Sequence, residues 1–402
     1  MRYVIIIPDG GADYPLDDLD GKTALEAASI PNTDKLAATG RLGTAVTTPK
    51  GMPCGSDTCS MCLLGYDPAR YHTGRAPLEA AALGIELAPT DWIFRVNLVT
   101  VIDGLMQDHS GGAIRSDEGR QLLETIEQAA DFPGATFHPG VSYRNILVDR
   151  SGERDWSRLI TTPPHDIPGE PISRHLPSGA PDADLLVSMI ETSEQRFAEH
   201  DVNLTRREMG ETPATHVWPW GQGIKPDMPA FSEVYGRRGA MITAVDLLAG
   251  IASLIGWERL DVPGQTSYHD TDYAAAGKHA IKAIDDYDLV CVHIEAPDEA
   301  SHAGDAATKV AALEAIDRHV VGPIHEALVQ RGEDWRILIM PDHFTRVETR
   351  KHDPTPVPFL IAGHKMNGVV ERVYTEAAAN EADLKIAHGH ELMEFFLDSG
   401  VR

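Results

Sequence analysis

The stretch YVIIIPDG, residues 3–10, sets the pattern from which the fold is predicted. A short apolar run, rich in β-branched residues, ends in a Pro-Asp pair, and the same arrangement recurs in YDLVCVHIEAPDE (287–299) and in WRILIMPDH (335–343). Such runs are typical of strands that are buried on both faces. The Pro-Asp pair at the end of each predicted strand supplies one aspartate, and these aspartates are Asp9, Asp298 and Asp342.

Helical patterns separate the predicted strands, for example in residues 23–40 and 308–332. Strands that alternate with helices favour an α/β fold with a mainly parallel, doubly wound sheet. In open sheets of this kind, ligands bind beyond the carboxyl ends of the strands. We therefore expect the three acids to converge on one site.

The middle of the chain differs in composition from the segments on either side. A chain of 402 residues is long for one core and suggests two domains. From about residue 91 to residue 226 the sequence is richer in turns, as in TTPPHDIPGEPISRHLPSGAPDAD (161–184). We expect residues 91–226 to form a smaller inserted α/β domain between a core made of 1–90 and 227–402, with hinges near 90–95 and 226–236. Long Pro/Gly loops of this kind are usually functional or mobile.

The composition limits the partners. Hydrophobic residues make up 42% of the chain and charged residues 24%, which is typical of soluble globular proteins. The net charge of −26 argues against nucleic acid or an anionic membrane as the main partner, but not against a small anionic substrate. No run approaches the length of a membrane span or of a signal-peptide core. Four cysteines, three of them close together, do not make a disulfide framework, so we expect a cytoplasmic protein; its oligomeric state is left open.

Histidines accompany the acids. Asp298 and His302 are four residues apart and would share one face of a helix, His343 follows Asp342 directly, and His352 precedes another apolar run. Mixed oxygen and nitrogen ligands suit Mn²⁺, Zn²⁺ or Fe²⁺ better than Ca²⁺. Three carboxylates and three imidazoles are too many for one catalytic ion with an open position, but they fit two ions.

The stretch CGSDTCSMC, residues 54–62, allows two interpretations. With Cys291 downstream, its cysteine spacing fits a plant-type iron–sulfur pattern. Alternatively, Ser56 begins a helix whose free N–H groups attract phosphate, and it acts as a nucleophile beside two metal ions. We favour the serine, because Cys291 falls inside a predicted core strand and Cys59 and Cys62 read as small buried thiols.

Three stretches carry a family resemblance: MPCGSDTCSMCLLGYDPARYHTGRAPLEAAALGIEL (52–87), EAPDEASHAGD (295–305), and PDH with KHDPTPVPFLI (341–343 and 351–361). They resemble the archaeal type of 2,3-bisphosphoglycerate-independent phosphoglycerate mutase, within the alkaline phosphatase superfamily, over essentially the whole chain. The resemblance implies an alkaline-phosphatase-like core, an inserted domain and two divalent ions. Mn²⁺ is favoured, with Mg²⁺, Zn²⁺ or Fe²⁺ as alternatives. The implied ligands are Asp9, Ser56, Asp342 and His343 for one ion, and Asp298, His302 and His352 for the other.

The resemblance also implies a reaction. Ser56 would take the phosphoryl group of 3-phosphoglycerate, and after reorientation the other hydroxyl of glycerate would take it back, without bisphosphoglycerate. His109 resembles a histidine that holds the phosphate, and His165 with Asp166 would act as acid and base on the hydroxyls. Candidate clamps for the carboxylate and phosphate are Arg75, Arg115, Arg144 and Lys278.

Three alternatives remain at this point. A homoserine kinase-like phosphotransferase or a phosphomonoesterase would use the same serine and metals. A cluster-bearing redox protein is the alternative from a different class.

Overall fold

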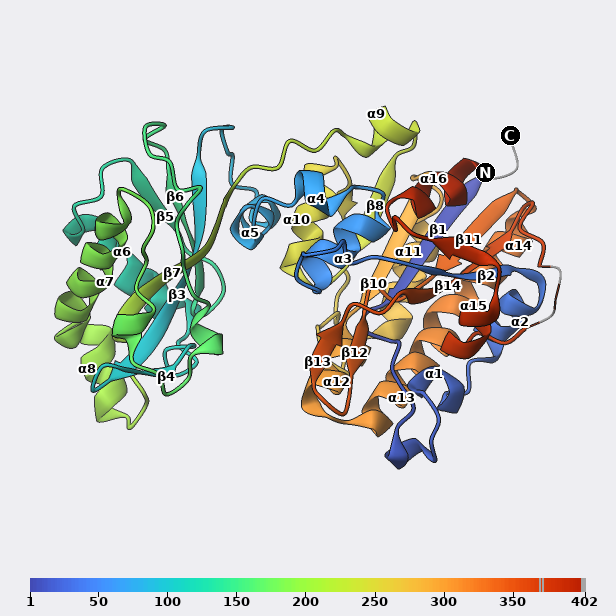
Figure 1. The fold of residues 1–402 in the computed structure, drawn as a ribbon, viewed down its shortest axis with the longest axis horizontal. Helices are drawn as coiled ribbons and strands as arrows, with labels where there is room; N and C mark the ends of the chain where they lie inside the picture. Colours follow the sequence, from blue (N-terminus) through green and yellow to red (C-terminus); the bar gives the residue numbers. More distant parts are fainter. Residues whose placement is uncertain (369, 371, 399–402) are drawn as a thin grey trace. The chain divides into compact units, whose positions relative to one another are not determined.

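In the computed structural model, the described residues are 1–368, 370 and 372–398. The chain divides into two compact units, Met1–His72 with Met228–Arg402 and, inserted between them, Thr73–Asp227 (Figure 1). Within the described ranges, no helix is both long enough and apolar enough to cross a membrane.

The first unit is built on an eight-stranded sheet. In spatial order its strands are β15 (Leu384–Ile386), β2 (Arg41–Ala45), β14 (Val357–Gly363), β11 (Trp335–Ile339), β1 (Arg2–Pro8), β10 (Leu289–Ile294), β8 (Gly239–Ile242) and β9 (Glu258–Arg259). β14 runs antiparallel to both of its neighbours, and the other described pairings of this sheet are parallel. The prediction of a mainly parallel α/β sheet is confirmed.

Helices accompany both the sheet and its connections. They are η1 (Asp17–Leu19), α1 (Ala24–Ala27), α2 (Pro31–Thr39), α3 (Ser56–Leu63), α4 (Pro68–Tyr71), α9 (Phe231–Tyr235), α10 (Asp246–Leu254), α11 (Tyr273–Ala283), α12 (Ala296–Ala303), α13 (Ala306–Ile316), η4 (Asp317–Val321), α14 (Gly322–Arg331), α15 (Glu376–Glu381) and α16 (Glu391–Asp398). Val4 and Ile6 of β1 pack with Leu313 and Ile316 of α13 in the main core cluster. Ile5 is equally buried but lies outside that cluster, as expected when successive side chains point to opposite faces.

The order of the central strands brings the predicted ligands to one edge. β1 lies between β10 and β11 and is parallel to both, with Ile7 opposite His293 and Ile6 opposite Ile339. The carboxyl ends of the three strands therefore meet. α12 starts directly after β10, and the hairpin of β12 (Phe344–Arg346) and β13 (Lys351–Asp353) follows β11.

The inserted unit has a sheet of its own, drawn in cyan and green in Figure 1. Its strands are β3 (Trp92–Ile102), β4 (Leu105–Asp108), β5 (Ala135–His138), β6 (Arg144–Asp149) and β7 (His216–Ile224), and the described pairings are antiparallel. Its helices are α5 (Arg75–Ala82), α6 (Ser116–Ala129), η2 (Pro164–Asp166), η3 (Ile172–Arg174), α7 (Ala183–Ala198) and α8 (Asp201–Glu208). The two ends of this unit lie together, because the Thr73 hydroxyl donates to the Ile224 carbonyl at 2.5 Å.

The boundaries of the insert differ from the expected 91–226. The C-terminal boundary falls at 227, one residue away, but the N-terminal boundary falls at 73. Residues 73–90 belong to the insert because Ala76 and Ala80 of α5 pack with Ile93 and Ile146 of its sheet. The segment 90–95, where we expected a hinge, lies inside the inserted unit, and Trp92 pairs with both β6 and β7.

Candidate metal centre and nucleophile

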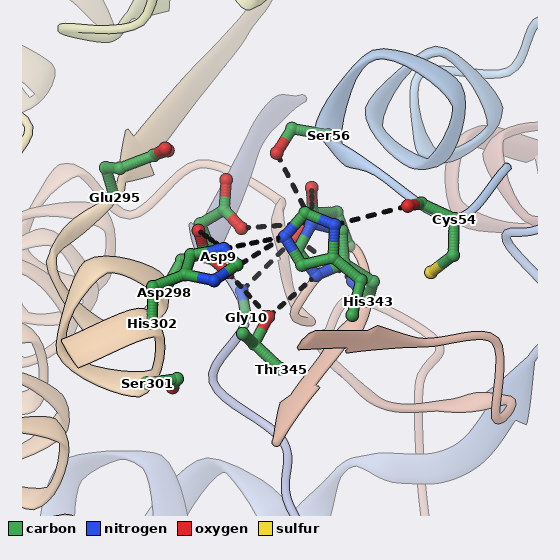
Figure 2. Close-up of polar contacts among 12 residues, drawn as sticks. Asp9, Gly10, Cys54, Ser56, Glu295, Asp298, Ser301, His302, His343 and Thr345 are labelled. Atoms are coloured by element: carbon green, nitrogen blue, oxygen red, sulfur yellow. Dashed lines mark hydrogen bonds and ion pairs between the residues drawn. The ribbon is translucent and has the colours of Figure 1, made fainter. Parts of the chain in front are cut away.

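The acids that follow the three central strands lie together (Figure 2). Asp9 comes directly after β1, Asp298 is in the first turn of α12, and Asp342 is in the turn after β11. Asp9 and Asp342 are completely buried, and Asp298 is 3% exposed. Removing three carboxylates from water is costly unless positive charge compensates them, so this edge of the sheet has the character of a cation site.

Asp9, Asp342 and His343 form one group of possible ligands, with one ligand atom from each lying within 4.8 Å of the others. The Nε2 atom of His343 is 3.5 Å from Asp9 Oδ1 and 3.5 Å from Asp342 Oδ2. Oδ1 of Asp9 is buried without a hydrogen-bond partner. A buried carboxylate oxygen aimed at another carboxylate and an imidazole fits a metal ligand.

Asp298, His343 and His352 form a second group by the same criterion. His302 lies beside it, since its Nε2 atom is 3.1 Å from Asp298 Oδ2 and 3.0 Å from His352 Nε2. His343 thus takes part in both groups, whereas the family resemblance assigned it to one ion only.

Hydrogen bonds to the Nδ1 atoms fix the orientation of two histidine rings. His302 Nδ1 is 3.0 Å from the Arg350 carbonyl, and His352 Nδ1 is 3.2 Å from the Cys54 carbonyl. A ring nitrogen that donates to a carbonyl carries the proton, which leaves Nε2 of a neutral ring free to bind a metal.

The electrostatics of the site follow from burial and close charges. Burial, together with the nearby Asp342 and Asp298 carboxylates, raises the pKa of Asp9 well above its usual value. Burial also opposes ionisation of Asp298, but hydrogen bonds from His302 and His352 outweigh it and hold the pKa of that carboxyl well below its usual value. Burial alone would lower the pKa of His352, but the hydrogen bond between His352 and Asp298 raises it to about 9. Without metal ions, the buried carboxylates and imidazoles therefore share a small number of protons. Bound divalent cations would replace those protons and compensate the carboxylate charges.

Ser56 is the first residue of α3, and the Gly55 before it is extended. Its Oγ atom lies 3.3 Å from His343 Nε2, at the edge of the ligand cluster (Figure 2). Ser60, one turn later, donates to Asp342 Oδ2 at 3.0 Å and so ties α3 to the site. The N-terminal N–H groups of α3 are available to an anion bound at Ser56.

Several residues of the site were missed by the sequence analysis. His293 Nε2 lies 2.7 Å from Asp9 Oδ2, and Thr345 Oγ1 donates to Asp298 Oδ1 at 2.5 Å. Glu295 completes a third group of possible ligands with Asp9 and His293. A signal was present for His293, since it is a polar residue inside an apolar strand, five positions before Asp298.

The inserted unit gathers a cluster of its own. His165 lies between His109, with ring centroids 6.2 Å apart, and Trp220, at 5.3 Å. Burial lowers the pKa of His165, and the positive charges of Arg95 and Arg75 add to this effect against the opposing charge of Asp166. Arg144 belongs to the same surroundings, because its charge acts on Arg95 together with that of Arg75. A basic, partly buried cluster of this kind suits an anion.

Comparison with known proteins identifies the family. A family model described as 2,3-bisphosphoglycerate-independent phosphoglycerate mutase matches residues 37–203. Proteins of that name from Methanothrix thermoacetophila and Methanothermobacter thermautotrophicus are 46% and 45% identical, covering 99% and 100% of this chain and 100% and 98% of theirs. The chain belongs to this family.

Solved structures agree with the mutase assignment. The PH0037 protein from Pyrococcus horikoshii matches with a TM-score of 0.83 at 27% identity, over 99% of this chain and 96% of that one. A cofactor-independent phosphoglycerate mutase from Thermoplasma acidophilum matches with a TM-score of 0.67 at 27% identity, over 98% of both chains. The resemblance on which the sequence analysis relied is confirmed.

Two further residues, Arg115 and Lys278, were also predicted to bind the substrate. Arg115 precedes α6 and pairs with Glu118 of that helix, in a network that includes Arg206 and Glu211. Lys278 is exposed on α11, and none of its described contacts involves a ligand residue. These placements do not decide whether either side chain contacts a substrate, so the clamp role of Arg115 and Lys278 stays a prediction.

The iron–sulfur alternative also finds no support. Across the part of the chain that the structure describes, no candidate ligand group contains a cysteine. Cys291 is fully buried on β10, as the core interpretation expected.

Proposed function

We propose that the protein interconverts 3-phosphoglycerate and 2-phosphoglycerate without bisphosphoglycerate, through a phosphoserine at Ser56. One observation carries the proposal. The Ser56 hydroxyl stands at a helix N-terminus and at the edge of two groups of possible metal ligands, 3.3 Å from His343 Nε2. Full-length relatives that bear the mutase name support the choice of substrate.

Two divalent ions are part of the proposal. Asp9, Ser56, Asp342 and His343 would hold one, and Asp298, His302 and His352 the other, with Mn²⁺ favoured over Mg²⁺, Zn²⁺ or Fe²⁺ for this mixture of oxygen and nitrogen ligands. When bound, such ions lower the pKa of a ligated hydroxyl and neutralise phosphoryl oxygens. The unpartnered Oδ1 atom of Asp9 and the inward-facing Nε2 atoms are the features of the chain that fit them.

The chain's own groups would act as follows. Ser56 Oγ forms a bond to phosphorus while the bond from phosphorus to O3 of 3-phosphoglycerate breaks and O3 takes up a proton. The N–H groups at the start of α3 stabilise the phosphoryl oxygens. Glycerate then turns, its 2-hydroxyl loses a proton and attacks the phosphoserine, and Ser56 is restored.

The inserted unit would bind the rest of the substrate. We assign the phosphate contact to His109, the proton transfers on the hydroxyls to His165 and Asp166, and the carboxylate to Arg75 and Arg144. His165 keeps a neutral ring at physiological pH, since burial lowers its pKa, and a neutral ring can accept a proton. A cytoplasmic location, where small phosphorylated metabolites occur, belongs to the same proposal.

A coupled assay tests the proposal. The protein is given 3-phosphoglycerate and Mn²⁺ without bisphosphoglycerate, and 2-phosphoglycerate is detected through enolase. The wild type and Ser253→Ala, which changes an exposed serine on α10, should both be active, and Ser56→Ala should be inactive. Release of free phosphate instead of 2-phosphoglycerate would identify a phosphomonoesterase. Full activity of Ser56→Ala would refute the nucleophile.

A further inference from the structure

Two cysteines flank the nucleophile. Cys54 stands two residues before Ser56, and Cys59 three residues after it. Their sulfur atoms are 4.0 Å apart, which is van der Waals contact, and the Thr48 hydroxyl lies 3.2 Å from the Cys59 sulfur. The mutase chemistry proposed above uses neither thiol.

The backbone explains why the sulfurs meet. Gly55 is the N-cap of α3, so Cys54 holds the position before the cap and Cys59 the fourth position of the helix. Side chains at these two positions commonly pack together and fix the angle at which the chain enters a helix. Here both partners are thiols, so the contact that sets the direction of α3 is one that oxidation can make covalent.

The two thiols differ in access. Cys54 is half-buried and Cys59 is buried. The other two cysteines are placed differently, since Cys62 lies 3.8 Å from the Val46 carbonyl and Cys291 is inside the sheet. Within the described residues, an oxidant therefore meets Cys54 first, and the thiol in contact with it is Cys59.

We propose that Cys54 and Cys59 are a site of reversible oxidation, at which hydrogen peroxide joins them in a disulfide that displaces Ser56. The Cys54 sulfur attacks one peroxide oxygen, the O–O bond breaks, and a sulfenic acid and water form. The Cys59 sulfur then attacks the Cys54 sulfur, and the sulfenic oxygen leaves as a second water. Each sulfur gives up one electron and one proton, and the peroxide is reduced to two waters.

The bond would change the geometry of the site. A disulfide requires an S–S distance of about 2 Å, roughly half the present separation, so the segment from Cys54 to Cys59 must contract around Ser56. The Cys54 carbonyl, which orients His352, moves with it. Figure 2 shows this carbonyl facing the rings while the sulfur points away from them, so oxidation would act through the backbone. A displacement of about 1 Å in a catalytic group can cost on the order of 10²-fold in rate.

Peptide mass spectrometry after peroxide treatment is the primary test. The protein is treated with hydrogen peroxide, free thiols are alkylated, and the digest is analysed before and after dithiothreitol. We expect Cys54 and Cys59 to escape alkylation together, in a peptide that lacks two hydrogen atoms and regains them on reduction. Cys62 and Cys291 should be alkylated after unfolding throughout. If Cys54 and Cys59 stay free, or if a bond joins another pair, the proposal is wrong.

A second measurement follows activity, and it rests on the proposed mutase function. Hydrogen peroxide should lower the wild-type mutase rate by on the order of 10²-fold, and dithiothreitol should restore it. The rates of Cys54→Ala and Cys59→Ala should not fall on peroxide treatment. Cys62→Ala, as the matched control on the same helix, should remain sensitive. A disulfide that forms without loss of activity would overturn the displacement of Ser56. If the reduced protein has no mutase activity, the proposed function fails while the peptide measurement still decides the oxidation.

Discussion

His293 donates to Asp9 and thereby decides which oxygen of that carboxylate faces the site. Thr243 Oγ1 lies 3.0 Å from His293 Nδ1 and already accepts a hydrogen bond from the Val245 amide. In the tautomer whose Nδ1 accepts from this hydroxyl, Nε2 is the donor to Asp9 Oδ2 at 2.7 Å. Oδ1 is left to face His343 Nε2 at 3.5 Å, where it fits a metal ligand.

The first prediction follows from this contact. Replacing His293 by Leu should weaken Mn²⁺ binding by about 10- to 100-fold, because partners behind a metal ligand orient it. Titration calorimetry on the metal-free protein measures this without any assay of activity. His293→Gln, whose side-chain amide can still donate near the position of Nε2, should retain most of the affinity. Equal loss in both variants would contradict the orienting role.

At the residue scale, the sequence predicts a side chain's position best where the local backbone structure determines it. Asp9, Asp298 and Asp342 could be predicted because each lies within four residues of the end of a recognisable buried strand. His293 is recognisable in the sequence as a polar residue in an apolar strand, but only the pairing with the neighbouring strand shows that its ring meets Asp9. For Arg115 and Lys278 the sequence gives less, since a long flexible cation is compatible with many anion sites and its neighbours along the chain do not fix where its charge lies.

At the scale of elements, Lys309 joins three segments of the first unit. From α13 its ammonium group donates to the Ala12 carbonyl at 3.2 Å, to Asp13 Oδ2 at 3.0 Å and to the Thr345 carbonyl at 2.7 Å. Lys309 is fully buried, and the side chain of Asp13 is 1% exposed. The loop after β1 and strand β12, which both carry residues of the site, are thus held to one helix.

The second prediction concerns this buried pair. Lys309→Met should lower the free energy of unfolding by about 3–5 kcal/mol, because it leaves the Asp13 carboxylate buried without its cation. Urea unfolding followed by circular dichroism measures the loss. The double variant Lys309→Met with Asp13→Asn should recover part of it. If the double variant is no more stable than the single one, the unpaired charge is not the cause.

The third prediction is a pH dependence at α15. Glu376 accepts from the Asp13 amide and the Thr23 hydroxyl, but burial prevails over these contacts and raises its pKa from 4.5 to about 6. The folded protein thus binds this proton more tightly than the unfolded chain does. The contribution of this proton to the free energy of unfolding is complete below pH 4.5. It is lost as the pH rises through 6, by about 2 kcal/mol in total.

Unfolding of Glu376→Gln across this range checks the sign. The stability of the wild type relative to the variant should fall between pH 4.5 and pH 7, because the variant has no proton to lose. Glu381→Gln, an exposed change on the same helix, should leave the wild-type profile unaltered. A difference between wild type and Glu376→Gln that stays constant with pH would contradict the raised pKa.

The boundaries of elements are harder to predict than their order. The alternation of strands and helices indicated the large sheet, because hydrophobic period and length are local properties. The start of the insert at residue 73 depends on Ala76 and Ala80 packing on Ile93, and small residues on a helix give no sign in the sequence of which sheet they will cover.

For the whole molecule, each unit has a core of its own, and the candidate metal ligands all belong to the first unit. The fourth prediction is that Mn²⁺ raises the unfolding temperature of the first unit only. A ligand that binds only the folded state stabilises it by about 2.7 kcal/mol at a concentration 100 times its dissociation constant.

Scanning calorimetry of the metal-free protein, with and without Mn²⁺, measures this effect. The unfolding peak of the first unit should move to a higher temperature, and that of the inserted unit should not move. The double variant Asp9→Asn with Asp298→Asn should remove the shift. A shift that survives in the double variant would place the bound metal elsewhere.

The hydrogen bond between Thr73 and Ile224 has a consequence for how such a chain can evolve. Because the insert leaves and re-enters the first unit at neighbouring points, a short turn could replace it, and so could another module with adjacent ends, without stretching the host sheet. The inserted unit, to which we assign the substrate contacts, is thus exchangeable separately from the unit that carries Ser56 and the candidate metal ligands. Replacement of the insert alone would then change the substrate contacts that we propose, while Ser56 and the candidate ligands keep their positions in the first unit.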